Sequence, residues 1–109
     1  MWAPVLSRPE PELAILGAGR RDLNWDQGLP VPVEVRDERG QHARDAAGWT
    51  IESLDDQHAY LRLPPAAPLR PADLVRLTVS HPCTAHDRWL TAVIAADDDT
   101  VVSVARCYF

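Results

Sequence analysis

The sequence predicts an all-β fold, a small barrel or sandwich of about seven short antiparallel strands. Ten prolines in 109 residues favour turns and short strands, because proline lacks the N–H that a helix interior needs. Short apolar or alternating segments recur between clusters of turn residues, a pattern typical of strands and hairpins. No segment shows a sustained helical period.

The N-terminal half carries the first expected strands. Residues 5–8 and 13–16 are short apolar segments, and the turn between them contains Pro9 and Pro11. Residues 31–36 alternate apolar and polar side chains, and Pro32 suits an edge strand. Residues 20–30 are expected to form a loop, and residues 41–48 a loop or a single helical turn.

The C-terminal half continues the same pattern. Residues 49–54 alternate, with Trp49, Ile51 and Ser53 on one face. We expect further strands at 58–63, 74–79, 89–95 and 100–108, with a proline-rich connector at 64–71 and a turn at 96–99. Trp49 and Trp89 are expected in the core, whereas Trp2 is a candidate for a surface that a partner buries.

Length and charge limit the class of protein. A chain of 109 residues fits one domain over residues 1–109. Its net charge of −5 gives no attraction to phosphate backbones. No apolar segment reaches the ~18 residues that a membrane span needs, and the N-terminus lacks the regions of a signal peptide. We therefore expect a cytoplasmic domain whose partner is neither nucleic acid nor membrane.

Lysine is missing from the sequence, because all eleven residues counted as lysine or arginine are arginine. Arginine stays protonated and cannot form the Schiff base that holds pyridoxal phosphate covalently. The chain therefore offers no lysine-dependent catalysis by itself, and none of its residues is expected to bind that cofactor.

His81 and Cys83 are the candidate metal ligands. In an extended segment, side chains two residues apart point to the same side, and imidazole and thiolate both bind zinc well. His86 and Asp87 lie close enough to be further candidates. A second interpretation stays open on spacing alone: a buried cysteine beside a surface histidine, because a structural zinc site normally takes four protein ligands.

Three other patterns are weaker. Gln57-His58 precedes an expected strand and fits a polar turn with a hydrogen-bonded histidine. The acidic run 97–99 lacks the alternating ligand spacing of a calcium loop and fits a solvated hairpin turn. A disulfide between Cys83 and Cys107 requires a geometry that the sequence does not establish.

Several segments, in this order, resemble one family. The most specific is Ser80-His81-Pro82-Cys83-Thr84, and the others are 5–11, 19–22, 26–30, 56–61, 69–77, 87–89 and 104–109. They resemble the serine dehydratase-like C-terminal domain of D-serine dehydratases, D-threonine aldolases and related amino acid deaminases, and the bacterial deaminases most of all. The resemblance covers nearly the whole chain, although Pro71-Ala72 stands where the family usually has glycine.

The resemblance implies a function shared with a second domain. In that family the domain follows an alanine-racemase-like barrel that carries the pyridoxal phosphate and its lysine. The β-domain supplies a His-x-Cys or His-x-Asp pair to a divalent metal, usually zinc. By position, the pair here would be His81 and Cys83, and His58 would lie beside the site or at an interface. The barrel is not part of this sequence.

Two kinds of function therefore remain open. The first is an enzyme part that docks onto a barrel domain or subunit and completes a D-amino acid dehydratase or deaminase, converting a β-hydroxy amino acid to a keto acid and ammonia. The second is a non-catalytic protein- or metal-binding module, or an orphan fragment of a broken gene. In either case, uncovered interface surface predicts self-association of the isolated domain.

Overall fold

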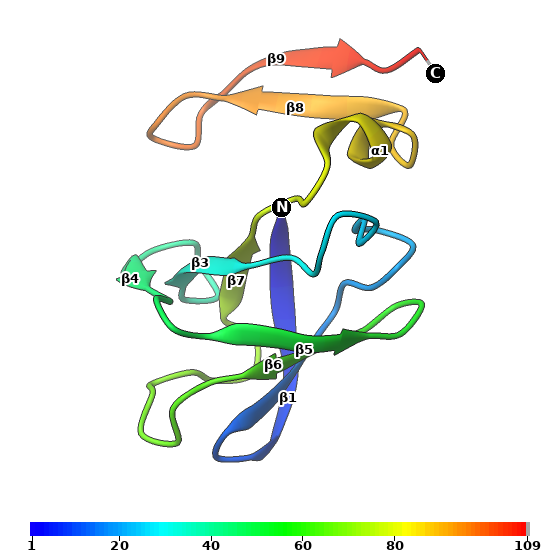
Figure 1. Cartoon of the computed structure of the whole chain (residues 1–109). Coiled ribbons are helices and arrows are strands. Elements are labelled where there is room, and N and C mark those ends of the chain that lie inside the picture. The colour runs from blue at the N-terminus through cyan, green and yellow to red at the C-terminus, as the bar shows by residue number, and fades with distance from the viewer. Residues whose placement is uncertain (109) are drawn as a thin grey trace.

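The computed structural model describes residues 1–108, which form nine strands and one short helix (Figure 1). Six strands precede the middle connector and one follows it: β1 (Trp2–Glu10), β2 (Leu13–Leu16), β3 (Pro32–Arg36), β4 (Arg44–Asp45), β5 (Thr50–Leu54), β6 (Ala59–Arg62) and β7 (Leu74–Leu77). The chain then forms α1 (Pro82–His86) and a hairpin of β8 (Thr91–Ala95) and β9 (Val101–Arg106).

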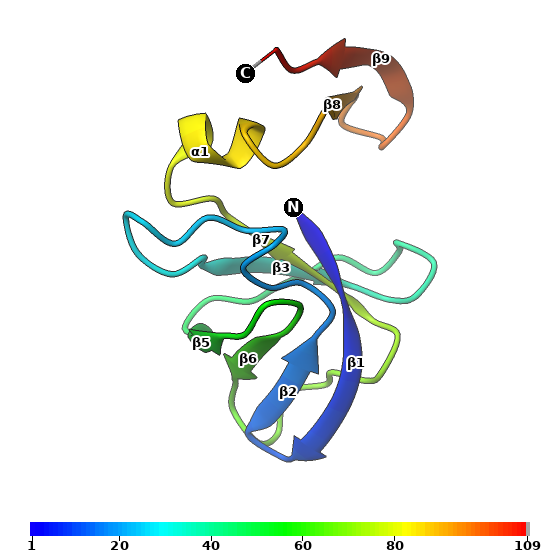
Figure 2. The same cartoon turned by 90° about the vertical axis from the view of Figure 1, so that its right-hand side faces the viewer.

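Seven of the strands form one curled antiparallel sheet with the order β4-β3-β7-β1-β2-β6-β5. Strand β1 is the longest and lies in the middle, paired with β7 through its first residues and with β2 through its remainder. The curl gives a half-barrel, which Figure 2 shows from the side. The predicted all-β fold of about seven short antiparallel strands is thus confirmed.

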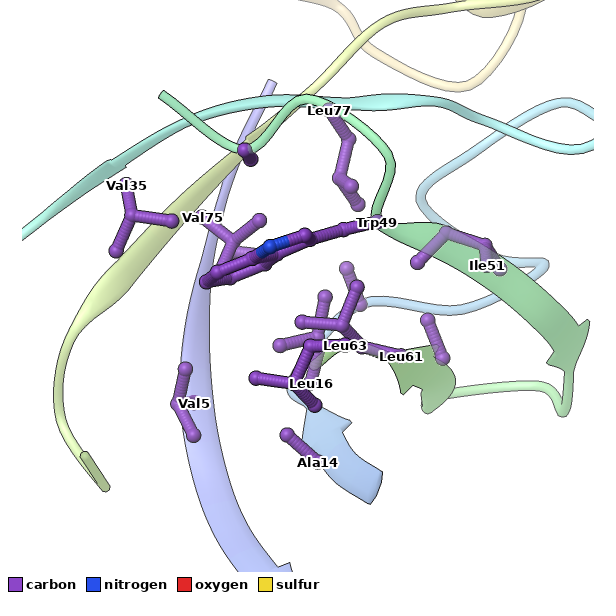
Figure 3. Close-up of a cluster of buried hydrophobic side chains, with 14 of the residues drawn as sticks. Val5, Ala14, Leu16, Val35, Trp49, Ile51, Leu61, Leu63, Val75 and Leu77 are labelled. Carbon is purple, nitrogen blue, oxygen red and sulfur yellow. The ribbon is translucent and has the colours of Figure 1, made fainter. Parts of the chain in front are cut away.

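The core fills the inside of the curled sheet (Figure 3). Inward-facing residues alternate along the strands, as in β2, where Ala14 and Leu16 are buried, and β6, where Ala59 and Leu61 are buried. Trp49 belongs to this core as predicted, with only 8 % of its surface exposed.

Two local features of the sheet differ from the predictions. The register of β5 against β6 shifts between Ile51 and Ser53. Because this β-bulge reverses the alternation, Leu54 is buried and Ser53 is exposed. Residues 44–45, expected within a loop or helical turn, form the short strand β4 beside β3.

The C-terminal segment differs more. Residues 81–83 are not extended throughout: His81 has extended backbone, but Pro82 and Cys83 begin α1. Proline suits this position because the first helical N–H has no partner within the helix. Within residues 1–108, β8 and β9 form a two-stranded sheet of their own, separate from the seven-stranded sheet. Trp89, predicted to be in the core, is 45 % exposed. No helix within residues 1–108 is long and apolar enough to cross a membrane.

Candidate metal centre

The loop after β2 leads to the candidate centre and is held by close backbone packing. The backbone N–H groups of Arg20 and Arg21 donate to the carbonyls of Asp55 and Asp56 at 2.8 and 3.0 Å. A Cβ at Gly19 would lie 2.5 Å from the Asp55 carbonyl oxygen, so only glycine allows this approach. The contact fixes the start of the loop against the turn between β5 and β6.

Asn24 joins this loop to the segment that follows β7. Its side chain is buried, and Nδ2 donates to the Ser80 hydroxyl at 3.0 Å and to the His81 carbonyl at 2.9 Å. The orientation of the amide is set by these contacts, because a flipped amide would put its oxygen against the His81 carbonyl. Asn24 therefore determines where the backbone of His81 lies.

The His81 ring is oriented by a carboxylate. Its Nδ1 lies 2.8 Å from Oδ2 of Asp26, and the Thr84 hydroxyl donates to the other Asp26 oxygen at 3.0 Å. These hydrogen bonds, the one from His81 first, lower the pKa of Asp26 to about 2. Asp26 is therefore an ionised acceptor at neutral pH, and Nε2 is the ring nitrogen that this pair leaves for a ligand.

Cys83 lies in the first turn of α1, and its side chain is exposed. It is a free thiol, as is Cys107, so no disulfide joins them. The alternative of a buried cysteine beside a surface histidine does not describe this arrangement. Among residues 1–108, no three His, Cys, Asp or Glu side chains gather into a group that could hold a metal ion.

The donor types of His81 and Cys83 suit a divalent metal, but the prediction that an extended segment points both side chains to one side is wrong, because Cys83 is in α1. Imidazole and thiolate are suitable zinc ligands, and catalytic sites keep positions for water or substrate. A histidine that binds a metal through one nitrogen normally gives its other N–H to a carboxylate, which is the relation between His81 and Asp26. Asp26 was not identified from the sequence as part of the site. The one indication of it was that Asp26 opens segment 26–30, which resembles a loop of the family.

A hollow of about 280 Å³ lies beside Asp26, lined by Trp25, Asp26, Thr84, Asp87 and Arg88. The Trp25 ring has the Arg20 guanidinium 5.6 Å and the Arg88 guanidinium 5.4 Å from its centre. Arg88 is also held by the Thr84 carbonyl at 2.6 Å. Asp87 thus lies near the candidate centre, next to a cationic and aromatic surface.

The remaining candidates lie elsewhere or have other partners. His58 is exposed and lines a separate hollow that includes Arg21 and Asp22. His86 contacts Cys107, with Nδ1 3.6 Å from the sulfur, a pairing that sequence reasoning did not find because 21 residues separate them. The acidic run forms the hairpin turn, where Asp99 pairs with Arg36.

Trp2 packs against charged side chains at the edge of the half-barrel. The guanidinium groups of Arg36 and Arg76 lie 4.6 and 5.9 Å from its ring centre. Its side chain is therefore half-buried by the chain itself rather than left as open apolar surface.

Comparison with known proteins places the chain in a family. The crystal structure of D-threonine aldolase from Filomicrobium marinum is similar, with a TM-score of 0.74 and 25 % identity. The similarity covers 97 % of this chain and 26 % of the aldolase chain, so this chain spans about a quarter of that protein. No curated protein matches significantly. A family model described as "Putative serine dehydratase domain" matches residues 1–95. The chain therefore belongs to this serine dehydratase domain family.

Proposed function

We propose that the chain is the metal-binding C-terminal β-domain of a pyridoxal-phosphate-dependent D-amino acid dehydratase or deaminase, inactive by itself. The observation that carries the proposal is the Asp26–His81 pair at 2.8 Å, with Cys83 two residues further along the chain. An exposed histidine needs no oriented ring for stability, whereas a metal ligand does.

His81 Nε2 and Cys83 Sγ would hold the metal, which we take to be zinc. Bound there, zinc would act as a Lewis acid on the hydroxyl of a β-hydroxy amino acid and make it a better leaving group. Asp26 would keep the His81 ring in the ligating tautomer, and Thr84 would hold Asp26 in place. We further propose that the lysine and the pyridoxal phosphate belong to an alanine-racemase-like barrel, in the cytoplasm.

The C-terminal hairpin supports the need for a partner. Its apolar side chains are uncovered on both faces: the cross-strand pair Val93 and Val104 is 63 % and 58 % exposed on one face, and Ile94 is 47 % exposed on the other. Alternate residues of a strand point to opposite faces, so a single covering surface inside this chain could not bury both. Exposed apolar surface of this kind marks an interaction site, and a barrel domain or subunit is the partner we propose.

This surface gives a first testable prediction. The isolated chain should self-associate, and sedimentation velocity should show a concentration-dependent shift from monomer to larger species. A Val93→Asp, Val104→Asp variant should sediment as a monomer, because charges on the hairpin oppose apolar association. A wild-type chain that stays monomeric at high concentration would contradict this prediction.

A chimera tests the function itself. The matching quarter of the Filomicrobium marinum aldolase would be replaced by this chain, and cofactor loading, zinc content and turnover of β-hydroxy D-amino acids would be measured. We expect turnover that falls at least about 100-fold in both His81→Ala and Cys83→Ala. Gln27→Ala, an exposed change in the same loop as Asp26, is the matched control and should retain activity.

The second candidate is a non-catalytic binding module or an orphan fragment, favoured by the missing lysine, which leaves the chain without the group that holds pyridoxal phosphate. A folded, cofactor-loaded chimera whose turnover is insensitive to His81→Ala would support this second function. A chimera that binds zinc through His81 but turns over no substrate would support metal binding alone.

A further inference from the structure

A second pair of metal-ligating side chains lies outside the His81 centre. Nδ1 of His86, at the end of α1, is 3.6 Å from Sγ of Cys107, just beyond β9. The two residues come from different elements and are 21 positions apart, so the fold rather than the local sequence brings them together.

The separation of the two donor atoms agrees with shared coordination. A zinc ion about 2.3 Å from a thiolate sulfur and about 2.0–2.1 Å from an imidazole nitrogen, at a tetrahedral angle, separates the two donors by about 3.5 Å. The observed distance is 3.6 Å. A zinc ion could therefore bind both atoms with little movement of either side chain.

Cys107 is positioned by a backbone hydrogen bond, and His86 by its place at the end of α1. The Cys107 N–H donates to the Leu90 carbonyl at 2.8 Å, which fixes the residue beyond the end of β9. His86 is exposed and Cys107 is half-buried. Water or a partner's side chain would complete the coordination, since the described residues supply no third clustered ligand.

We propose that His86 and Cys107 form a second zinc site, distinct from the His81 and Cys83 pair, which fastens the end of the hairpin to α1. Zinc binding would displace the thiol proton of Cys107 to solvent and leave the imidazole neutral. The site would stabilise the hairpin, whose strands β8 and β9 contain no buried residue. The proposal does not depend on the proposed enzymatic function.

Reciprocal variants separate the two sites. A His81→Ala, Cys83→Ser variant keeps only the second pair, and a His86→Gln, Cys107→Ser variant keeps only the first. Cobalt(II) is the probe, because thiolate coordination gives a charge-transfer absorption band in the near ultraviolet. We expect the His81→Ala, Cys83→Ser variant to bind about one cobalt ion per chain and to show this band. Adding Cys107→Ser to that variant should abolish the band.

A second readout does not depend on the His81 and Cys83 pair. Zinc should slow hydrogen exchange of the β9 amides in the wild type and not in Cys107→Ser, which by itself should lower the zinc stoichiometry by about one ion per chain. Absence of cobalt binding by the folded His81→Ala, Cys83→Ser variant, or binding unaffected by Cys107→Ser, would overturn the second site. If only the His86→Gln, Cys107→Ser variant fails to bind cobalt, the second site is supported, and the His81 and Cys83 pair does not bind metal by itself.

Discussion

Replacing Asn24 by alanine should lower the free energy of unfolding by about 2 kcal/mol. Asn24 is 1 % exposed, and its amide donates to Ser80 at 3.0 Å, to the His81 carbonyl at 2.9 Å and more weakly to Asp26 at 3.4 Å. Each good hydrogen bond contributes roughly 1 kcal/mol net. The two short bonds together therefore account for about 2 kcal/mol.

Two smaller effects oppose each other. The Asn24 Oδ1 is buried without a hydrogen-bond partner among the described residues, so its removal relieves a small desolvation cost. The void left by the amide adds a small destabilisation. The His81 carbonyl keeps the N–H of Ala85 at 3.2 Å, so that acceptor is not stranded.

Urea unfolding followed by circular dichroism measures the change. Gln27→Ala is the matched control, because it removes an exposed amide from the same loop and should alter stability by less than about 0.5 kcal/mol. An Asn24→Ala variant as stable as the control would refute the view that this amide holds the loop after β2 to the segment that follows β7.

Three further predictions concern the sheet and the hairpin. Gly19→Ala should cost about 1–3 kcal/mol in thermal unfolding, because its Cβ would lie 2.5 Å from the Asp55 carbonyl oxygen; an unchanged melting temperature would contradict this close approach. Leu61→Ala should cost about 2–5 kcal/mol, as Leu61 is fully buried; a loss below 1 kcal/mol would mean that the core is not packed there. The Thr100 backbone N–H holds the pKa of Asp98 below its usual 3.8, so its stabilisation is full above that pH and declines as the pH falls towards the folded pKa; Asp98→Asn should flatten the acid limb of a stability–pH curve, and an identical limb would refute this.

The strands of the half-barrel were predictable because their residues carry a local pattern. Residues 13–16 and 59–62 alternate buried and less buried side chains, so short segments alone indicate strands there. The bulge in β5 was not predictable, because two-residue periodicity assumes an unbroken register. The bulge shifts Leu54, which the pattern put on the outer face, into the core.

The candidate centre was predictable only in part. His81 and Cys83 could be named from their residue types and spacing, whereas Asp26 is 55 positions from His81 and meets it only through the fold. The helix at 82–86 was missed because Pro82 suits both an extended segment and the first position of a helix. Trp89 was misplaced because it lies between α1 and β8 and not within a strand, where its indole N–H donates to the Asp22 carbonyl at 3.2 Å.

The zinc content of the purified His86→Gln, Cys107→Ser variant, with and without His81→Ala, tests the central claim most directly. That claim is that Asp26 and the fold prepare His81 and Cys83 for a metal. We expect about one zinc ion per chain. This zinc should be lost when His81 is replaced by alanine, and the affinity for zinc should fall when Asp26 is replaced by asparagine. Zinc content that is unchanged by His81→Ala, or zinc absent from the folded parent variant, would contradict the claim.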